Sequence, residues 1–404
     1  MHPAIEQHAW TERGLMLGGR AATTLAAEAG QTPFFVYDFN LVERRFSQLR
    51  KHLPDALSVS YAVKANPMLP LVTRIGGLVD GFDVASAGEM RIAIDAGMGR
   101  ESISFAGPGK TNTELAQAIA AGIVLEIESE GELERALRIG DATGIAPNIA
   151  VRINPDFSVK ASGMRMGGGA QQFGIDAERV PAVLSELGGS NAVFHGLHVF
   201  PGSQNLQADI LAEAYERIAN LAIRIGRESP SAPTRINLGG GFGIPYFPNE
   251  TALDLDALAP VLCRVAARLR DAFPGVDLRV ELGRYLVGEA GVYLTRVVER
   301  KVSRGKTYLV TDGGLHHQLA ASGNFGQRIR RNFPVAAAGP YNGPEETVTV
   351  VGCLCTPLDL LGDEVVLPRL EPGDLIAVFQ AGAYGLTASP TRFLGHPAPL
   401  EMLV

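Results

Sequence analysis

The sequence predicts an α/β protein built on a (β/α)8 barrel, with a second, mainly β domain. Between about residues 34 and 290, apolar runs alternate with turns and helix-period segments, giving about eight strand-helix units. Eight units over roughly 250 residues is the size of a closed barrel, whereas a doubly wound open sheet more often has about six strands. After residue 290 the helical period gives way to Val-, Tyr- and Thr-rich runs. We therefore assign 34–290 to the barrel and 1–33 plus 291–404 to a β-rich domain.

The expected elements follow in order along the chain. A short buried strand at 34–38 precedes the others. The expected barrel strands are 57–62, 81–85, 102–106, 122–127, 148–153, 194–200, 235–238 and 278–281, with helices between them such as 87–96, 111–120, 130–142 and 255–272. Strands of the second domain are expected at 292–298, 307–310, 347–351, 364–367 and 374–379. Residues 315–334 form a long polar segment, which indicates a functional loop or short helices.

Composition narrows the class of protein. The 404 residues are 46% hydrophobic and 20% charged and include 47 glycines, which is typical of a globular α/β enzyme. The formal net charge of −7 and the lack of a basic stretch argue against nucleic acid or an anionic membrane as partner. Three cysteines are too few for a disulfide framework, no apolar run reaches membrane-spanning length, and the start does not resemble a secretory signal. We expect a cytoplasmic protein.

Polar residues stand at the carboxyl ends of the expected strands, where barrels of this kind place their chemistry. They are Lys64, Asp83, 107–110 (GPGK), Glu128, Arg152, Asn154, His198, 239–241 (GGG), Glu281 and Arg284. A single charged strand end is usually solvated. A whole rim of such residues indicates a site.

Lys64 is the candidate centre of the chemistry. It ends the apolar run 57–63, and a lysine that is buried there must be paired, neutral or covalently engaged. The stretch alone leaves open a second reading, in which the amine reaches solvent at the strand end.

Three further features surround the rim. The glycines of 239–243 (GGGFG) follow a strand and favour a phosphate site, with Arg284 as a fixed cation, although a tight barrel turn explains them too. Glu281 at an apolar strand end needs a cationic partner, either Arg284 or a protonated pyridine nitrogen. In 195–198 (HGLH) the two imidazoles point to opposite faces of a strand, so they do not make a metal pair; one is read as a satisfied core histidine and the other as a ring that can stack on a planar cofactor.

Cys353 and Cys355 would lie on one face of a strand. No second Cys/His cluster has a matching spacing, so a metal site is not expected. A reactive acid-base thiol and a plain buried cysteine remain the alternatives. A lysine, a phosphate loop, an arginine, a carboxylate and a stacking histidine together describe a pocket for pyridoxal 5'-phosphate held as a Schiff base.

Motifs over nearly the whole chain then point to a family. They are 61–66 (YAVKAN), 82–89 (FDVASAGE), 152–155 (RINP), 172–175 (QFGI), 195–199 (HGLHV), 237–242 (NLGGGF), 281–284 (ELGR), Cys355 and 381–384 (AGAY). In this order they resemble the fold-type III PLP-dependent decarboxylases, with an alanine racemase-like fold, which include the ornithine and diaminopimelate decarboxylases.

The resemblance implies a role for each matching residue. Lys64 would carry the cofactor, His198 would stack on its ring, and Glu281 would bind its pyridine nitrogen. The phosphate would be held by Ser203, Gly240, Gly241, Arg284 and Tyr384, and Asp83 and Arg152 are counted with the cofactor-binding residues. Cys355 would reach across the interface of a head-to-tail homodimer with shared active sites and protonate the intermediate after carbon dioxide leaves. Asp312 and Asp359 match positions near the distal end of the substrate.

Thr356 departs from the family pattern. Ornithine and diaminopimelate decarboxylases have an acidic residue directly after the cysteine, and the neutral Thr356 weakens the case for a free diamino acid. The arginine segment that grips a distal carboxylate is also not recognisable, since Arg328, Arg330 and Arg331 form a different pattern.

A narrower set of motifs resembles one branch of the family. It comprises 107–110 (GPGK), 164–168 (MRMGG), 199–205 (VFPGSQN), 242–247 (FGIPYF), 312–317 (DGGLHH) and 393–397 (FLGHP). The branch includes the glutamyl-carrier-protein decarboxylase of butirosin biosynthesis and similar enzymes of natural-product gene clusters. It implies a substrate tethered to an acyl carrier protein.

Three other functions remain as alternatives. They are a free diamino-acid (diaminopimelate-, ornithine- or lysine-like) decarboxylase, an amino-acid racemase of the same fold, and a catalytically inactive binding homologue. Glu281 argues against the racemase, because racemases of this fold usually offer an arginine to the pyridine nitrogen. Lys64 and Cys355 argue against the inactive homologue.

Overall fold

The computed structural model describes residues 2–158, 164–165, 167–200, 202–325, 327 and 330–404. Five positions in the segments with predicted motifs or loops, Met166, Pro201, Gly326, Arg328 and Ile329, lie outside this part of the chain. The chain divides into two compact units. The first unit comprises Met1–Arg44, Pro245–Glu250 and Leu286–Val404, and the second comprises Arg45–Ile244 and Thr251–Tyr285.

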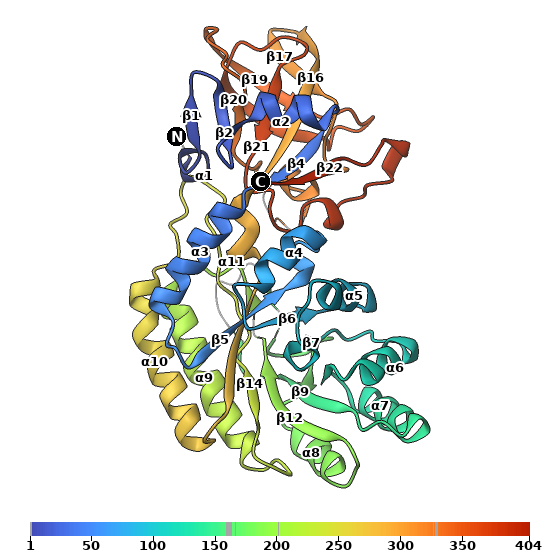
Figure 1. Ribbon diagram of the computed structural model, residues 1–404. Coiled ribbons are helices and arrows are strands. Elements are labelled where there is room, and N and C mark those ends of the chain that lie inside the picture. The colour runs from blue at the N-terminus through green and yellow to red at the C-terminus, as the bar shows by residue number, and fades with distance from the viewer. Residues whose placement is uncertain (1, 159–163, 166, 201, 326, 328–329) are drawn as a thin grey trace. The chain divides into compact units, whose positions relative to one another are not determined.

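The second unit is a closed barrel of eight parallel strands (Figure 1). Its strands are β5 (Leu57–Ala62), β6 (Gly81–Val84), β7 (Ile103–Phe105), β8 (Val124–Ile127), β9 (Asn148–Asn154), β12 (Val193–Val199), β14 (Arg235–Asn237) and β15 (Asp277–Leu282). They pair in chain order, and the pairing of β15 with β5 closes the ring. The predicted (β/α)8 barrel is confirmed, and β5 has the predicted bounds.

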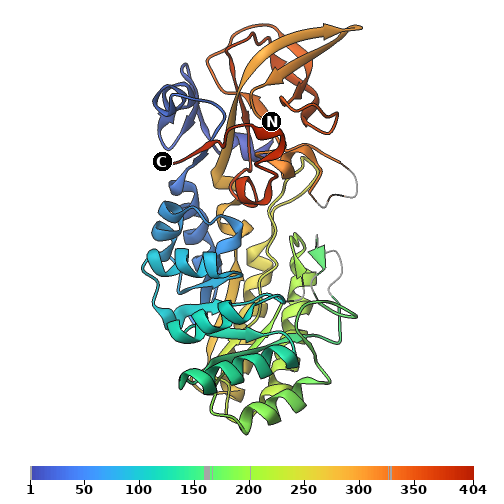
Figure 2. The same cartoon turned by 90° about the vertical axis from the view of Figure 1, so that its right-hand side faces the viewer.

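Helices alternate with these strands and line the outside of the barrel (Figure 1 and Figure 2). They are α4 (Leu69–Gly76), α5 (Ala87–Asp95), α6 (Asn112–Ala121), α7 (Glu130–Thr143), α8 (Val180–Gly188), α9 (Ala208–Gly226) and α10 (Leu255–Ala272), and α3 (Phe39–His52) joins the two units. Side-chain caps fix several starts. Thr111 and Glu114 form a capping box on α6, and Asp254 accepts a hydrogen bond from the amide of Ala257 at the start of α10.

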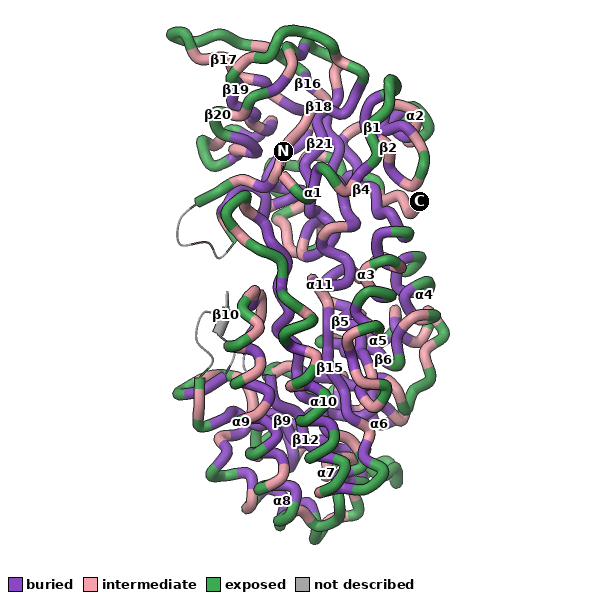
Figure 3. Tube along the Cα trace, turned by 90° about the vertical axis from the view of Figure 1, so that its left-hand side faces the viewer, coloured by how far each residue is buried: buried purple, intermediate pink, exposed green. Residues whose placement is uncertain are grey.

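The strands of the barrel are the most deeply buried part of this unit (Figure 3). Every residue of β6, β7 and β8 is buried, because helices cover one face and barrel side chains the other. Charged residues on such strands have no water to solvate them, so each needs a partner inside the protein.

The first unit is built on an eight-stranded, mixed sheet. Its strands are β4 (Phe34–Tyr37), β16 (Gly291–Ser303), β17 (Lys306–Thr311), β18 (Val335–Ala337), β19 (Glu345–Val351), β20 (Leu360–Pro368), β21 (Leu375–Val378) and β22 (Leu400–Leu403). The order is β18-β21-β16-β17-β19-β20, and β4 pairs with β16 and β22. The predicted mainly β second domain is confirmed.

Two expectations about this unit are wrong. The sequence places the strand at 34–38 in the barrel, but β4 pairs with β16 and β22 because Phe34 and Val36 belong to the hydrophobic core of the β-rich unit. Cys353 and Cys355 do not share a strand face, because β19 ends at Val351 and both cysteines lie in bends before β20. The thiols therefore have different surroundings.

The N-terminal segment contains elements that the sequence did not reveal. They are α1 (Pro3–Glu6), the small antiparallel sheet of β1 (Ala9–Thr11), β2 (Gly14–Leu17) and β3 (Arg20–Ala21), and α2 (Ala22–Ala29). The described residues between 315 and 334 contain one short 3-10 helix, Leu319–Ser322, among loops. Among the described residues, no helix is both long enough and apolar enough to cross a membrane.

Candidate active site

Lys64 lies at the carboxyl end of β5, in the 3-10 turn Val63–Ala65. Its side chain is 34% exposed, and its Nζ lies 3.8 Å from Oδ2 of the fully buried Asp83 and 5.9 Å from the centre of the Phe200 ring. The amine is therefore engaged at the barrel rim and still open to solvent. This geometry combines the two readings that the sequence left open.

A buried cluster of Glu126, His198 and Glu281 lies on three barrel strands. His198 Nδ1 is 2.5 Å from a carboxylate oxygen of Glu126, and His198 Nε2 is 3.4 Å from one of Glu281. These are ion-pair distances, but neither ring nitrogen has a partner with hydrogen-bond geometry among the described residues. Asn237 Nδ2 donates to Glu281 at 2.6 Å and fixes that carboxylate.

The cluster is charged. Burial alone would lower the pKa of His198, but the two carboxylates outweigh it and raise that pKa to about 10. Burial acts to raise the pKa of Glu281, and the His198 cation, Lys64 and the Asn237 hydrogen bond lower it to about 2. Burial and the nearby Glu281 raise the pKa of Asp83 well above its usual range. At neutral pH, Glu281 is thus a carboxylate that can hold a second cation.

The glycine loop after β14 packs closely against the backbone of neighbouring segments. A side chain at Gly240 would press its Cβ into the carbonyl oxygen of Glu281, and Gly241 has φ +100°, which favours glycine. Ser203 Oγ is buried and has no hydrogen-bond partner among the described residues. A Cβ at Gly241 would lie 2.9 Å from the carbonyl oxygen of Gly202, so the loop lies beside Ser203. The loop backbone and the unsatisfied Ser203 hydroxyl together suit a bound anion.

Two further rim residues, Arg152 and Lys110, pair with buried carboxylates. Arg152 pairs with Glu128 at 2.7 Å, and Glu128 also accepts the amides of Gly107 and Gly174 at 2.5 and 3.1 Å. Lys110 is 4% exposed and donates to Glu132 at 2.6 Å and to two carbonyl groups. The ion pair of Arg152 with Glu128 holds the loops at the end of the barrel.

His195 and His198 differ as expected from strand geometry. His195 Nε2 lies 3.0 Å from Asn148 Oδ1, which makes it the satisfied histidine, whereas His198 faces the acidic cluster. Glu126 is not among the predicted site residues. The sequence does contain a signal for it. Side chains two apart on a strand point to the same face, and Glu126 is two residues before the predicted Glu128.

Arg284, the first residue of α11 (Arg284–Val287), belongs to the second unit, whereas Cys355, Tyr384, Asp312, Thr356 and Asp359 belong to the first. Cys355 is exposed and Tyr384 is partly buried with φ +52°. Asp312 accepts hydrogen bonds from Thr295 Oγ1 and the Arg296 amide at 2.7 and 2.9 Å, and from Thr32. The amide of Leu358 donates to Thr356 Oγ1 at 3.3 Å. Their roles toward a substrate stay predictions.

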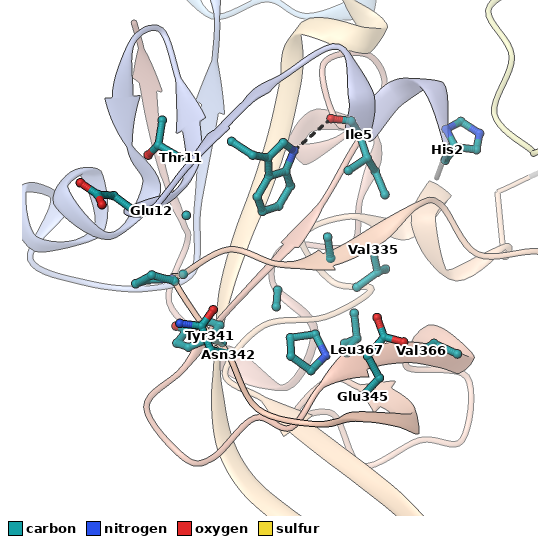
Figure 4. A pocket seen from close by; sticks show the side chains of 17 residues that line it. His2, Ile5, Thr11, Glu12, Val335, Tyr341, Asn342, Glu345, Val366 and Leu367 are labelled. Carbon is teal, nitrogen blue, oxygen red and sulfur yellow. Dashed lines mark hydrogen bonds between the residues drawn. The ribbon is translucent and has the colours of Figure 1, made fainter.

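A separate cavity of about 590 Å³ opens in the first unit (Figure 4). Trp10, whose Nε1 donates to the Ile5 carbonyl at 3.3 Å, lines this cavity together with Val335, Tyr341 and Val366. None of the predicted site residues lines this cavity.

The barrel residues fit pyridoxal 5'-phosphate. An amine stands at a strand end, a buried carboxylate ionised at neutral pH can hold a ring cation, and a glycine loop with an unsatisfied serine hydroxyl can hold a phosphate. The fold and site thus define a PLP-dependent barrel enzyme. Residues 39–288 match the family described as the pyridoxal-dependent decarboxylase, pyridoxal binding domain, and the chain belongs to this family of PLP-dependent carboxy-lyases.

Two relatives extend the match along the chain. An L-glutamyl-[BtrI acyl-carrier protein] decarboxylase of Niallia circulans is 38% identical over 95% of this chain and 91% of its own length. A diaminopimelate decarboxylase of Archaeoglobus fulgidus is 33% identical over 96% of this chain and 91% of its own length.

Solved structures show the same fold. The diaminopimelate decarboxylase of M. jannaschii in complex with L-lysine covers all of this chain and 94% of that chain, with TM-score 0.88 and 25% identity. The diaminopimelate decarboxylase of Helicobacter pylori in complex with L-lysine has TM-score 0.83 and 27% identity over 95% of this chain and 94% of that one. The cofactor and the reaction type predicted from the motifs are confirmed.

Proposed function

We propose that this enzyme removes the α-carboxylate of an amino acid that is carried on an acyl carrier protein. The 38% identity to the glutamyl-carrier-protein decarboxylase over 95% of the chain is the observation that supports this substrate class most. Thr356 supports it as well, because a neutral residue after Cys355 offers no charge to a distal amine. Glutamate as its thioester is the first candidate amino acid.

The residues of the chain divide the work of this reaction. Bound pyridoxal phosphate supplies an electron sink for the pair left behind when carbon dioxide departs. Lys64 would carry the cofactor, and ionised Glu281 would keep its ring nitrogen protonated. Gly240, Gly241, Ser203, Arg284 and Tyr384 would bind the phosphate, and His198 would lie against the ring. Cys355 would deliver a proton to Cα of the product.

A free diamino acid is the second candidate substrate. The diaminopimelate decarboxylase relatives and the L-lysine complexes among the similar structures favour it. A racemase is disfavoured by Glu281, since a carboxylate at the ring nitrogen strengthens the electron sink beyond what racemisation needs.

Carbon dioxide release separates the substrates. The PLP-loaded enzyme is given glutamyl-, aspartyl- and lysyl-carrier protein and the same amino acids free, together with diaminopimelate and ornithine. Release from glutamyl-carrier at least about 100-fold faster in kcat/KM than from any free amino acid supports the proposal. Faster release from free diaminopimelate or lysine would establish the second candidate instead. Lys64→Ala controls for cofactor-independent release, and chiral analysis detects racemised amino acid.

The proton donor needs its own test. If Cys355 protonates Cα, Cys355→Ala should lower kcat by at least about 100-fold or alter the product, while Cys263→Ala, on the exposed face of α10, should do neither. An unchanged rate and product in Cys355→Ala would refute this assignment.

We infer that the active form is a head-to-tail homodimer with shared sites in the cytoplasm. If Cys355 acts in the partner's site, mixing inactive Lys64→Ala and Cys355→Ala chains should restore activity. About half of the dimers would be mixed, each with one intact site of two, so about one quarter of wild-type activity is expected. No recovery in chains shown to exchange would contradict shared sites.

A further inference from the structure

Three potential metal ligands meet in the first unit, from segments far apart in sequence. His316 follows β17, Cys353 follows β19, and His396 lies just after the 3-10 helix Phe393–Gly395. One ligand atom from each side chain lies within 4.8 Å of the other two. Cys353 Sγ is 3.8 and 3.9 Å from the two ring nitrogens of His396, and the rings of His316 and His396 are 5.0 Å apart.

His316 is the unusual member of this group. Its side chain is 0% exposed, and neither Nδ1 nor Nε2 has a hydrogen-bond partner among the described residues. A buried polar group without a partner costs about 1–3 kcal/mol, so its presence needs a reason. A ligand bound to the ring would supply that reason.

A set of hydrogen bonds holds the segments that carry these ligands. Asp359 accepts the amide of Leu315 at 2.6 Å and the amide of Leu354 at 2.9 Å, and these are the neighbours of His316 and Cys353 in the chain. His317 Nδ1 lies 3.0 Å from the Tyr293 hydroxyl, and its Nε2 lies 3.1 Å from the carbonyl oxygen of Pro397, which follows His396. Metal sites commonly have such an outer layer that orients the ligands.

We propose that His316, Cys353 and His396 bind a divalent transition-metal ion, in the first place Zn²⁺. Thiolate sulfur and imidazole nitrogen are the ligand atoms that zinc takes most often in proteins, and three protein ligands leave a fourth position for water or another ligand. Ligand atoms around tetrahedral zinc are about 3.3–3.6 Å apart, so these side chains need to approach by at most about 1.5 Å.

Metal binding by a thiol is coupled to loss of its proton. On binding, the S–H bond breaks, the S–Zn bond forms, and one proton is released to solvent.

Zinc binding would join three loops that otherwise depend on hydrogen bonds. Cys355 and Thr356 closely follow Cys353 in one of these loops. The bound ion would therefore restrict the segment that carries the predicted proton donor, whatever the substrate is. The site does not depend on the proposed substrate class.

Zinc content tests the site directly. The PLP-loaded protein is purified without chelator, its zinc measured by mass spectrometry, and zinc affinity determined against a chromophoric chelator. About one zinc per chain is expected. Cys353→Ser and His396→Asn should weaken zinc binding by at least about 100-fold, whereas Cys263→Ser and Cys355→Ser should retain it. X-ray absorption should show one sulfur at about 2.3 Å and two nitrogens at about 2.0 Å.

Three results would overturn the proposal. They are no zinc binding by the wild-type chain, equal binding by Cys353→Ser, and a loss in Cys355→Ser that matches the loss in Cys353→Ser. Circular dichroism of each variant shows whether the fold is retained. Because Ser differs from Cys by one atom, Cys353→Ser decides the question if His396→Asn does not fold. Carbon dioxide release is not needed for the result, so failure of the proposed substrate would not be confused with failure of this site.

Discussion

Two clusters built around buried histidines behave in opposite ways. In the barrel, Glu126 and Glu281 flank His198 and raise its pKa to about 10. In the β-rich unit, burial lowers the pKa of His316 to about 4 and that of His317 to about 3, and neighbouring histidines add to this effect. Burial disfavours the cation in every case, so the neighbours decide the charge. The first cluster suits a cofactor with a cationic ring, and the second keeps its histidines neutral.

The largest effect is expected from Lys64→Ala, which removes the amine from the rim of the barrel cluster. The variant should lose the visible absorbance of the bound cofactor, and decarboxylation should fall by at least about 1,000-fold, because the covalent attachment point is gone. Absorption spectra and carbon dioxide release measure both. Lys306→Ala, an exposed lysine on β17, is the control and should change neither. A retained cofactor band in Lys64→Ala would refute the assignment.

Glu281→Gln should reduce kcat/KM by about 100- to 1,000-fold with little change in fold. The substitution keeps the shape but removes the negative charge that balances His198 and would stabilise the cofactor ring. Steady-state kinetics measures the loss, and Glu213→Gln on the exposed face of α9 serves as control. Wild-type kinetics in Glu281→Gln would show that the reaction does not need the negative charge of Glu281.

Glu126→Gln tests the charge of His198 through stability. Because the folded-state pKa of His198 is raised from 6.5 to about 10, its ion pairs contribute stability fully below pH 6.5 and lose it as pH rises toward 10. The wild-type chain should therefore be more stable than Glu126→Gln near pH 6.5, and the difference should shrink up to pH 10. Thermal unfolding across this range measures it. A difference that does not depend on pH would show that His198 is neutral.

Tyr293→Phe addresses the neutral cluster and should have the smallest effect. It removes the hydroxyl that lies 3.0 Å from His317 Nδ1 and leaves that buried nitrogen without this partner. We expect a loss of about 1–2 kcal/mol in the free energy of unfolding, from one unmade hydrogen bond. Urea unfolding measures it against Tyr308→Phe, on β17, which should be neutral. Equal stability of both variants would show that the hydrogen bond to His317 contributes nothing.

The sequence predicted the barrel and the cofactor correctly, because the signals for both lie in short segments of the chain. Apolar runs and helical periods depend on near neighbours, and the bounds of β5 and α10 agree with the prediction residue by residue. Lys64, His198 and Glu281 stand at strand ends, and strand ends of a barrel meet by topology. Long-range pairing was less visible, since nothing near β4 shows that its partners are β16 and β22.

The sequence by itself determined that this chain is a PLP-dependent decarboxylase, because each motif sits in one short segment whose role is tied to one strand end. Only the tertiary structure decided which buried charges face each other. It placed Glu126 against His198, and it brought His316 and His396 to Cys353 while leaving Cys355 exposed. The physical reason is that pKa values and ligand sets depend on distances between side chains, and distances between remote segments are fixed by folding.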